Sequence, residues 1–160
     1  MTAYDFNFTA INGDPMPLSE LEGKTLLVVN TASFCGYTPQ YRALEALWQD
    51  YKDKGLVLVG VPSDSFNQEY DDNAEIKEFC DTNYSITFPL TESTAVKGAD
   101  AHPFYAWVKD EGGRSAEPSW NFNKVLVDAN GAFVKTFGSG VAPDAGMLRR
   151  AIDEALPPSD

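Results

Sequence analysis

Two runs of apolar residues that do not alternate with polar ones stand out in the first half of the chain. Residues 26–29 and 56–61 are apolar on both faces, which is typical of strands buried inside an α/β sheet. Between them, Leu44, Leu47 and Tyr51 recur at helical spacing. Strand, helix and strand in succession predict a βαβ unit with a right-handed crossover. The loops that follow the two strands should then lie at the same edge of the sheet, where open α/β folds place their sites.

The helix of this unit has clear start and stop signals. We expect Thr38 as the N-cap, Pro39 at the first helical position and Gly55 as the C-cap. Cys35 therefore precedes a helix N-terminus, where free N–H groups and the helix dipole favour a thiolate. The dipole is worth only about 0.3–1 kcal/mol, which moves a pKa by less than about one unit. A reactive Cys35 needs further donors, and this segment alone leaves an inert buried cysteine equally open.

The remaining segments alternate between short strands and amphipathic helices. Cys80 falls on the apolar stripe of one of these helices, with Ile76 and Phe79. The expected elements are a hairpin turning at 12–14, a helical turn at 19–23, a helix over 69–84, an extended piece at 87–90, a helix from 103, a hairpin of strands 124–127 and 132–137, and a closing helix at 145–156.

The order of these elements predicts the fold class. The last hairpin should lie antiparallel beside the parallel strands, which gives a mixed central sheet with helices on both faces. We therefore expect one domain, residues 1–160, with a three-layer α/β fold like that of thioredoxin. A chain of this length can bury a real core as a single domain.

Composition and charge exclude several classes of function. The formal net charge is −12, which argues against nucleic acid or an anionic membrane as a partner and is otherwise explained by solubility. Two cysteines and one histidine, His102, fall short of a standard zinc site, so we expect no metal and no cofactor. The N-terminus shows no secretory signal, and no apolar run is long enough to span a membrane. We expect a cytoplasmic protein, in which a thiol pair is either catalytic or incidental.

Motifs along the chain resemble those of one family. The segment N-T-A-S-F-C-G-Y-T at 30–38 is followed by G-V-P at 60–62, F-C at 79–80, T-F-P-L at 87–90 and W-N-F at 120–122. In this order and spacing the sequence resembles glutathione peroxidases of the bacterial type, in which cysteine replaces selenocysteine. The resemblance runs from about Tyr4 to Leu156, and it rests on the A-S-x-C-G-x-T and W-N-F motifs taken together.

The resemblance implies a peroxidase that protects against oxidative stress. Family members use a tetrad of the nucleophile with Gln, Trp and Asn side chains, and Cys35, Trp120 and Asn121 match three of its positions. Indole and amide N–H donors aimed at the sulfur would favour the thiolate. The implied reaction is attack of Cys35 on hydrogen peroxide or an organic hydroperoxide, giving a sulfenic acid and water or an alcohol.

One tetrad position departs from the family pattern. The family loop reads G-F-P-C-N-Q-F-G-G-Q-E, whereas this chain has G-V-P-S-D-S-F-N-Q-E at 60–69, one residue shorter, with Ser65 at the Gln position. The missing donor is then Ser65 or a water molecule, which we favour, or Gln68 or Asn67 reached by a shifted loop. Asp64 would oppose the thiolate by like charge.

The resemblance also implies a way to regenerate the enzyme. Cys80 is at or within one position of the resolving cysteine of two-cysteine members reduced by thioredoxin. To act as a resolving thiol it would need its helix to unwind. The alternative is that Cys80 is a small residue of the core. Glutathione is the other candidate reductant. The high negative charge and the short segment between Cys80 and Trp120 favour thioredoxin and a monomer.

Other functions fit the sequence less well. A cysteine hydrolase would need a base, and His102 at the start of a helix is its one candidate. A thioredoxin-type oxidoreductase would need C-x-x-C, but Thr38 stands three residues after Cys35, and a peroxiredoxin would have Thr where Ala32 stands. A redox sensor that relays Cys35 oxidation to a partner protein remains the alternative to an enzyme.

Overall fold

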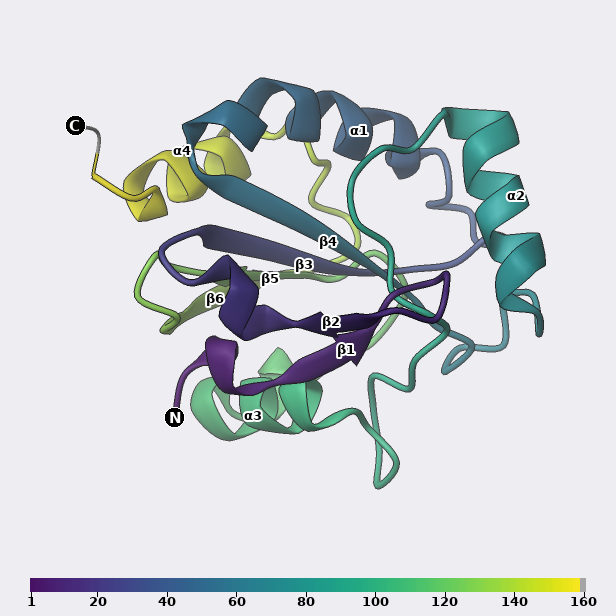
Figure 1. The fold of residues 1–160 in the computed structure, drawn as a ribbon, viewed down its shortest axis with the longest axis horizontal. Helices are drawn as coiled ribbons and strands as arrows, with labels where there is room; N and C mark the ends of the chain where they lie inside the picture. The colour runs from purple at the N-terminus through teal and green to yellow at the C-terminus, as the bar shows by residue number, and fades with distance from the viewer. Residues whose placement is uncertain (159–160) are drawn as a thin grey trace.

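A computed structural model describes residues 1–158 and shows a four-stranded mixed sheet at the centre (Figure 1). Its strands are β3 (Thr25–Thr31), β4 (Leu56–Pro62), β5 (Lys124–Val127) and β6 (Phe133–Phe137). β3 pairs in parallel with β4 and antiparallel with β5, and β5 pairs antiparallel with β6, which gives the order β4-β3-β5-β6. The predicted mixed sheet, with an antiparallel hairpin beside a parallel pair, is confirmed.

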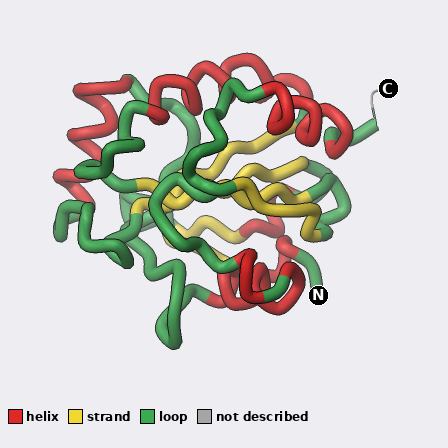
Figure 2. The backbone as a smooth tube through the Cα atoms, turned by 180° about the vertical axis from the view of Figure 1, so that it is seen from behind, coloured by secondary structure: helices red, strands yellow, loops and turns green. Residues whose placement is uncertain are grey.

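Helices cover both faces of this sheet, which Figure 2 shows from behind. α1 and α4 lie on one face, and α3 with the β1–β2 hairpin lies on the other. α2 lies beside the ends of β3 and β4 that lead into the candidate site (Figure 1). The bounds are β1 (Asn7–Thr9), β2 (Pro15–Pro17), α1 (Gln40–Tyr51), α2 (Asn73–Tyr84), α3 (Pro103–Gly112) and α4 (Gly146–Ala155), with 3₁₀ turns at Ala3–Asp5, Leu18–Leu21, Lys52–Lys54 and Arg114–Ala116. The thioredoxin-like, three-layer α/β prediction is confirmed.

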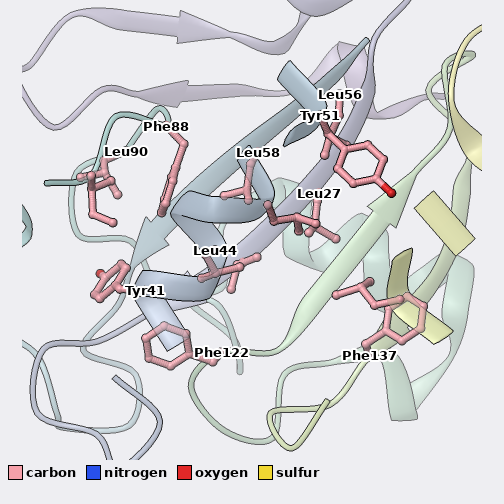
Figure 3. Close-up of a cluster of buried hydrophobic side chains, with 14 of the residues drawn as sticks. Leu27, Tyr41, Leu44, Tyr51, Leu56, Leu58, Phe88, Leu90, Phe122 and Phe137 are labelled. Atoms are coloured by element: carbon pink, nitrogen blue, oxygen red, sulfur yellow. The ribbon is translucent and has the colours of Figure 1, made fainter. Parts of the chain in front are cut away.

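Each face of the sheet has its own apolar core because side chains alternate along β3. Leu27 and Val29 belong to the cluster under α1 and α4, whereas Leu26 and Val28 belong to the cluster under α3. Figure 3 shows part of the first cluster, in which Leu27 and Leu58 from the sheet lie under Leu44 of α1. All seven residues of β3 are buried. Burial of each apolar side chain of β3, from Leu26 to Val29, is worth about 1.5–3 kcal/mol, so this strand anchors the fold.

Two predicted boundaries were wrong. Thr38 does not cap α1; the flanking residue is Pro39, and the Thr38 hydroxyl bonds to Cys35 and Ala32 instead. α2 begins at Asn73 rather than at residue 69, because Asp72 caps it by accepting a hydrogen bond from the Ala74 N–H at 3.0 Å.

Two glycines take the backbone conformations that their turns require. Gly55 ends the segment after α1 with φ +98°, as the C-cap prediction requires. Gly131 in the hairpin between β5 and β6 has φ +80°. In both places a residue with a side chain would be strained.

No helix within residues 1–158 is long and apolar enough to cross a membrane.

Candidate active site

Cys35 lies in a tight turn between β3 and α1, with 7% of its surface exposed. Its Sγ accepts a hydrogen bond from the backbone N–H of Tyr37 at 3.3 Å. Its own N–H donates to Thr38 Oγ1 at 2.9 Å, and the Thr38 hydroxyl donates to the carbonyl of Ala32 at 2.8 Å. The turn is therefore closed by the threonine side chain, and a peptide N–H points at the sulfur. A donor in that position favours the thiolate over the thiol.

The loop after β4 lies beside the Cys35 turn, as the parallel pairing of β3 and β4 predicts. The Phe34 N–H donates to the backbone carbonyl of Gln68 at 3.0 Å, and the Ser63 N–H donates to the Thr31 carbonyl at 3.0 Å. The Gln68 side chain then reaches Asn121, whose Nδ2 donates to Gln68 Oε1 at 3.0 Å. This use of its oxygen leaves the N–H groups of the Gln68 amide for another acceptor.

The W-N-F segment, which is far from Cys35 in the sequence, lies at the same edge of the sheet. The Phe122 N–H donates to the Asn30 carbonyl at 2.6 Å, and Asn30 Nδ2 donates to the Trp120 carbonyl at 3.0 Å. Phe122 has φ +63°, and its ring packs edge-on against Tyr41 with centroids 5.4 Å apart (Figure 3). Because non-glycine residues rarely adopt this conformation, the segment is held in a specific shape by these contacts.

The structure gathers Trp120 and Asn121 at this edge but does not bond them to the sulfur. Asn121 is fully buried, whereas Trp120 is 37% exposed and packs against Phe66 with ring centroids 5.3 Å apart. Among the hydrogen bonds of residues 1–158, the donor to Cys35 Sγ is the Tyr37 N–H, and neither the indole nor the Asn121 amide donates to it.

Ser65 and Gln68 differ in where their side chains are engaged. Ser65 Oγ accepts the Val96 N–H at 3.1 Å and lies 3.0 Å from Ser63 Oγ, so it holds the segment around Val96 by a hydrogen bond. Gln68, which the sequence analysis ranked below Ser65, is the side chain that contacts Asn121. The Tyr37 N–H was missed, although the C-G-x-T turn is a signal that could have identified it.

Cys80 lies inside the molecule rather than at the mouth of the site. It is fully buried on α2, on the same stripe as Ile76, and it shares one apolar cluster with Cys35. Burial raises the pKa of the Cys80 thiol to about 11. Both cysteines are free thiols in this structure. Cys80 therefore cannot attack as a thiolate while α2 stays packed, because the thiolate is the nucleophilic form.

The acidic side chains of the loop after β4 differ in environment. Asp64, expected to oppose the thiolate, is exposed, so water and salt screen its charge. Glu69 is buried, and this burial raises the pKa of its carboxyl, an effect that the hydrogen bond from the Tyr70 N–H to Glu69 Oε1 reduces. This buried carboxyl therefore holds its proton more tightly than a free glutamate does.

His102 is remote from this chemistry. Its Nδ1 accepts the Phe104 N–H at 3.0 Å at the start of α3, and its ring stacks on Phe8 at 4.2 Å. Phe8 belongs to the core on the face of the sheet opposite to α1. A Cys–His pair of the hydrolase type is therefore not formed. Within residues 1–158, no group of three or more His, Cys, Asp or Glu side chains is arranged to hold a metal ion.

Three exposed aromatic rings belong to the segments that form the site. Phe34 is 55% exposed, Tyr37 41% and Trp120 37%, and Phe34 packs edge-on against Tyr70 at 4.5 Å. Two of these rings flank Cys35 in the sequence, and exposed apolar groups of this size mark contact surfaces. The segments that hold Cys35 and the W-N-F motif therefore expose apolar rings, in a protein with 24 acidic residues.

Comparisons with known proteins give one consistent result. A family model described as glutathione peroxidase matches residues 3–109. A glutathione peroxidase of Lactococcus lactis is 42% identical over 147 residues, which is 90% of this chain and 94% of that protein. A hydroperoxy fatty acid reductase of Synechocystis is 43% identical, covering 89% of this chain and 90% of that protein. The crystal structure of Trgpx in its apo form superposes with a TM-score of 0.78 at 31% identity, covering 97% of this chain and 95% of that one.

Proposed function

Since the chain belongs to the glutathione peroxidase family, we infer that it is a thiol peroxidase whose nucleophile is Cys35. The Cys35 thiolate attacks one oxygen of a peroxide, a sulfur–oxygen bond forms, and the O–O bond breaks. The sulfur becomes a sulfenic acid, and the leaving alkoxide or hydroxide takes up a proton to become an alcohol or water. The observation that carries this inference is the Tyr37 N–H directed at Cys35 Sγ in a turn at the carboxyl end of β3.

We further propose that Gln68, rather than Ser65, completes the amide set around the sulfur. Asn121 Nδ2 bonds to Gln68 Oε1, and the backbone of Gln68 bonds to Phe34, the residue before the nucleophile. Turned toward the sulfur, the Trp120 indole and the two amides would surround a thiolate with donors. Each hydrogen bond to a charged group is worth about 1.5–3 kcal/mol, which is more than the helix dipole supplies.

Cys80 is the proposed resolving thiol. Its sulfur attacks the Cys35 sulfenic acid, a disulfide forms, and the proton of Cys80 leaves with the hydroxyl group as water. The burial of Cys80 requires α2 to open first. That opening is inexpensive for a helix, because α2 buries only Ile76 and Cys80 and its other residues are at least partly exposed.

The surface suggests the partners. The exposed Phe34, Tyr37 and Trp120 favour organic hydroperoxides with an apolar part, in addition to hydrogen peroxide. The net charge of −12 disfavours anionic glutathione as the thiol that reduces the enzyme, so we propose thioredoxin in that role. A monomer and a cytoplasmic location remain our expectation.

The decisive experiment compares peroxide consumption by the wild type, Cys35→Ser and Cys80→Ser, with thioredoxin or glutathione as the reductant. We expect Cys35→Ser to be inactive and Cys80→Ser to react once with peroxide but to lose thioredoxin-linked turnover. Full turnover of Cys80→Ser would remove the resolving role, and activity of Cys35→Ser would overturn the mechanism. The redox-sensor alternative predicts fast oxidation of Cys35 with negligible turnover and a mixed disulfide to one partner protein.

A further inference from the structure

Lys124 is a buried ammonium group that the proposed chemistry does not use. It is fully buried at the start of β5, two positions after the end of the W-N-F segment. Its Nζ donates to the Val141 carbonyl at 2.6 Å and to Gln40 Oε1 at 2.8 Å, with the carbonyls of Ser139 and Gly138 at 3.3 and 3.5 Å. All four acceptors are neutral, and none of the ion pairs within residues 1–158 involves Lys124.

A buried charge without a counter-charge is costly, so its retention calls for a reason. A Met side chain would fill a similar volume without the cost of desolvation. Desolvation lowers the pKa of the Lys124 ammonium to about 8, so the group is still mainly charged at neutral pH. In that form it has three N–H donors for the four oxygens around it.

Two chains of hydrogen bonds lead from Lys124, one to the Cys35 turn and one to the Asn121–Gln68 pair. In the first, the Lys124 ammonium donates to the Gln40 side chain, and the backbone N–H of Gln40 donates to the Tyr37 carbonyl at 2.8 Å. The Tyr37 N–H then donates to Cys35 Sγ. The first residue of α1 thereby fixes the turn that presents the amide to the sulfur.

The second chain passes through Ser139. Gln40 Nε2 donates to the Ser139 carbonyl at 2.7 Å, and the Ser139 hydroxyl donates to the Asn121 carbonyl. The Asn121 side chain then donates to Gln68. The ammonium therefore joins α1 to the segment 138–141, and Ser139 links that segment to the W-N-F segment. Through these bonds it is connected both to the turn that holds the Tyr37 N–H and to the Asn121–Gln68 pair.

We propose that Lys124 is a positioning residue for the peroxidase reaction: by holding Gln40 against segment 138–141, it keeps the Tyr37 N–H and the Asn121 amide aligned for the Cys35 thiolate. This role rests on the proposed function of Cys35. It differs from a general contribution to folding because it predicts a change in the reactivity of Cys35 in particular. Misplacement of groups around a reacting atom by about 1 Å costs on the order of 100-fold in rate.

The test compares Lys124→Met with the wild type and with Lys135→Met, which removes an exposed lysine from the neighbouring strand β6. The readouts are the thiol pKa of Cys35, from the pH dependence of its alkylation in a Cys80→Ser background, and the rate constant of a single turnover with hydrogen peroxide. We expect Lys124→Met to raise the thiol pKa and to lower the rate constant by at least about tenfold. Lys135→Met should change neither.

Ser139→Ala keeps the test decisive if Lys124→Met does not fold. It removes only the hydroxyl that donates to the Asn121 carbonyl, and we expect a slower reaction with peroxide at unchanged circular dichroism. A lower melting temperature for Lys124→Met, with the wild-type thiol pKa and rate constant, would overturn the positioning role, as would wild-type kinetics in Ser139→Ala. Activity of Cys35→Ser in the same assay would instead overturn the function on which the role rests.

Discussion

The side chains of Gln68 and Ser65 lead to opposite expectations at the scale of single residues. Gln68 contacts Asn121, whereas Ser65 accepts the Val96 N–H. We expect Gln68→Ala to slow the reaction of Cys35 with hydrogen peroxide by about 10- to 100-fold, because a donor to a charged group is worth about 1.5–3 kcal/mol. Stopped-flow fluorescence of the tryptophans under pseudo-first-order peroxide would measure the rate constant.

Ser65→Ala is the matched variant for that measurement. It should leave the rate constant within about twofold of the wild type while lowering stability, because the buried Val96 N–H loses its acceptor at a cost of about 1–3 kcal/mol. The reverse pattern, with a slow Ser65→Ala and a normal Gln68→Ala, would return the tetrad position to Ser65.

The residues of the site differ in how far sequence could identify them. Cys35, Trp120 and Asn121 carry recognisable motifs, and the helix start after Cys35 can be read from Pro39. Gln68 could not be ranked above Ser65, because the loop is one residue short and its path depends on the Phe34–Gln68 bond. The sequence around Lys124 does not indicate its role, since its hydrogen-bond partners lie 14 to 84 positions away.

At the scale of elements, α2 should control how fast the disulfide forms. Asp72 caps α2 through the Ala74 N–H, and loss of such a cap costs about 1 kcal/mol. If α2 opens before Cys80 reacts, Asp72→Ala should populate the open form more and speed disulfide formation by about fivefold. The rate would be followed by the second fluorescence phase after one equivalent of peroxide.

Asp71→Ala is the control, because it removes an exposed carboxylate one position earlier that does not cap the helix. It should leave the second phase unchanged. Equal rates for Asp72→Ala and the wild type would show that opening of α2 does not limit the resolving step.

The start of α3 should be sensitive to acid through His102. Burial lowers the pKa of His102, although its bond to the Asn7 carbonyl partly opposes this, and its Nδ1 accepts the Phe104 N–H only when that nitrogen is unprotonated. A folded pKa below the unfolded value means that this cap contributes stability above about pH 6.5, and that the contribution is lost as pH falls through the folded pKa. Urea unfolding at pH 7 and pH 5 should show this loss.

Asn at position 102 can cap a helix but does not titrate in this range. His102→Asn should therefore lose less stability between pH 7 and pH 5 than the wild type does, and the difference isolates His102 from the many carboxylates. An identical loss in both proteins would mean that protonation leaves the cap intact.

The sequence pattern predicted those helices and strands that bury one face or both faces. β3 and β4 were evident as uninterrupted apolar runs, and α1 as a stripe of large apolar residues. The start of α2 was misplaced because residues 69–72 share its polar character, and only the Asp72–Ala74 bond marks the boundary. The Thr38 cap was wrong because its hydroxyl oxygen accepts a competing donor, the Cys35 N–H, which helix propensity does not reveal.

At the scale of the whole molecule, the excess of 24 acidic over 12 basic residues should decide which thiol reduces the enzyme. A neutral peroxide is not repelled by this charge, whereas glutathione carries a net negative charge and is. The Debye length falls from about 30 Å at 0.01 M salt to about 8 Å at 0.15 M, so salt screens the repulsion. We expect glutathione-linked turnover to rise several-fold over that range, while single-turnover oxidation by hydrogen peroxide stays constant. An uncharged thiol such as 2-mercaptoethanol is the control and should show no rise. Glutathione turnover that is independent of salt, and as fast as turnover with thioredoxin, would contradict the proposal that surface charge selects the reductant.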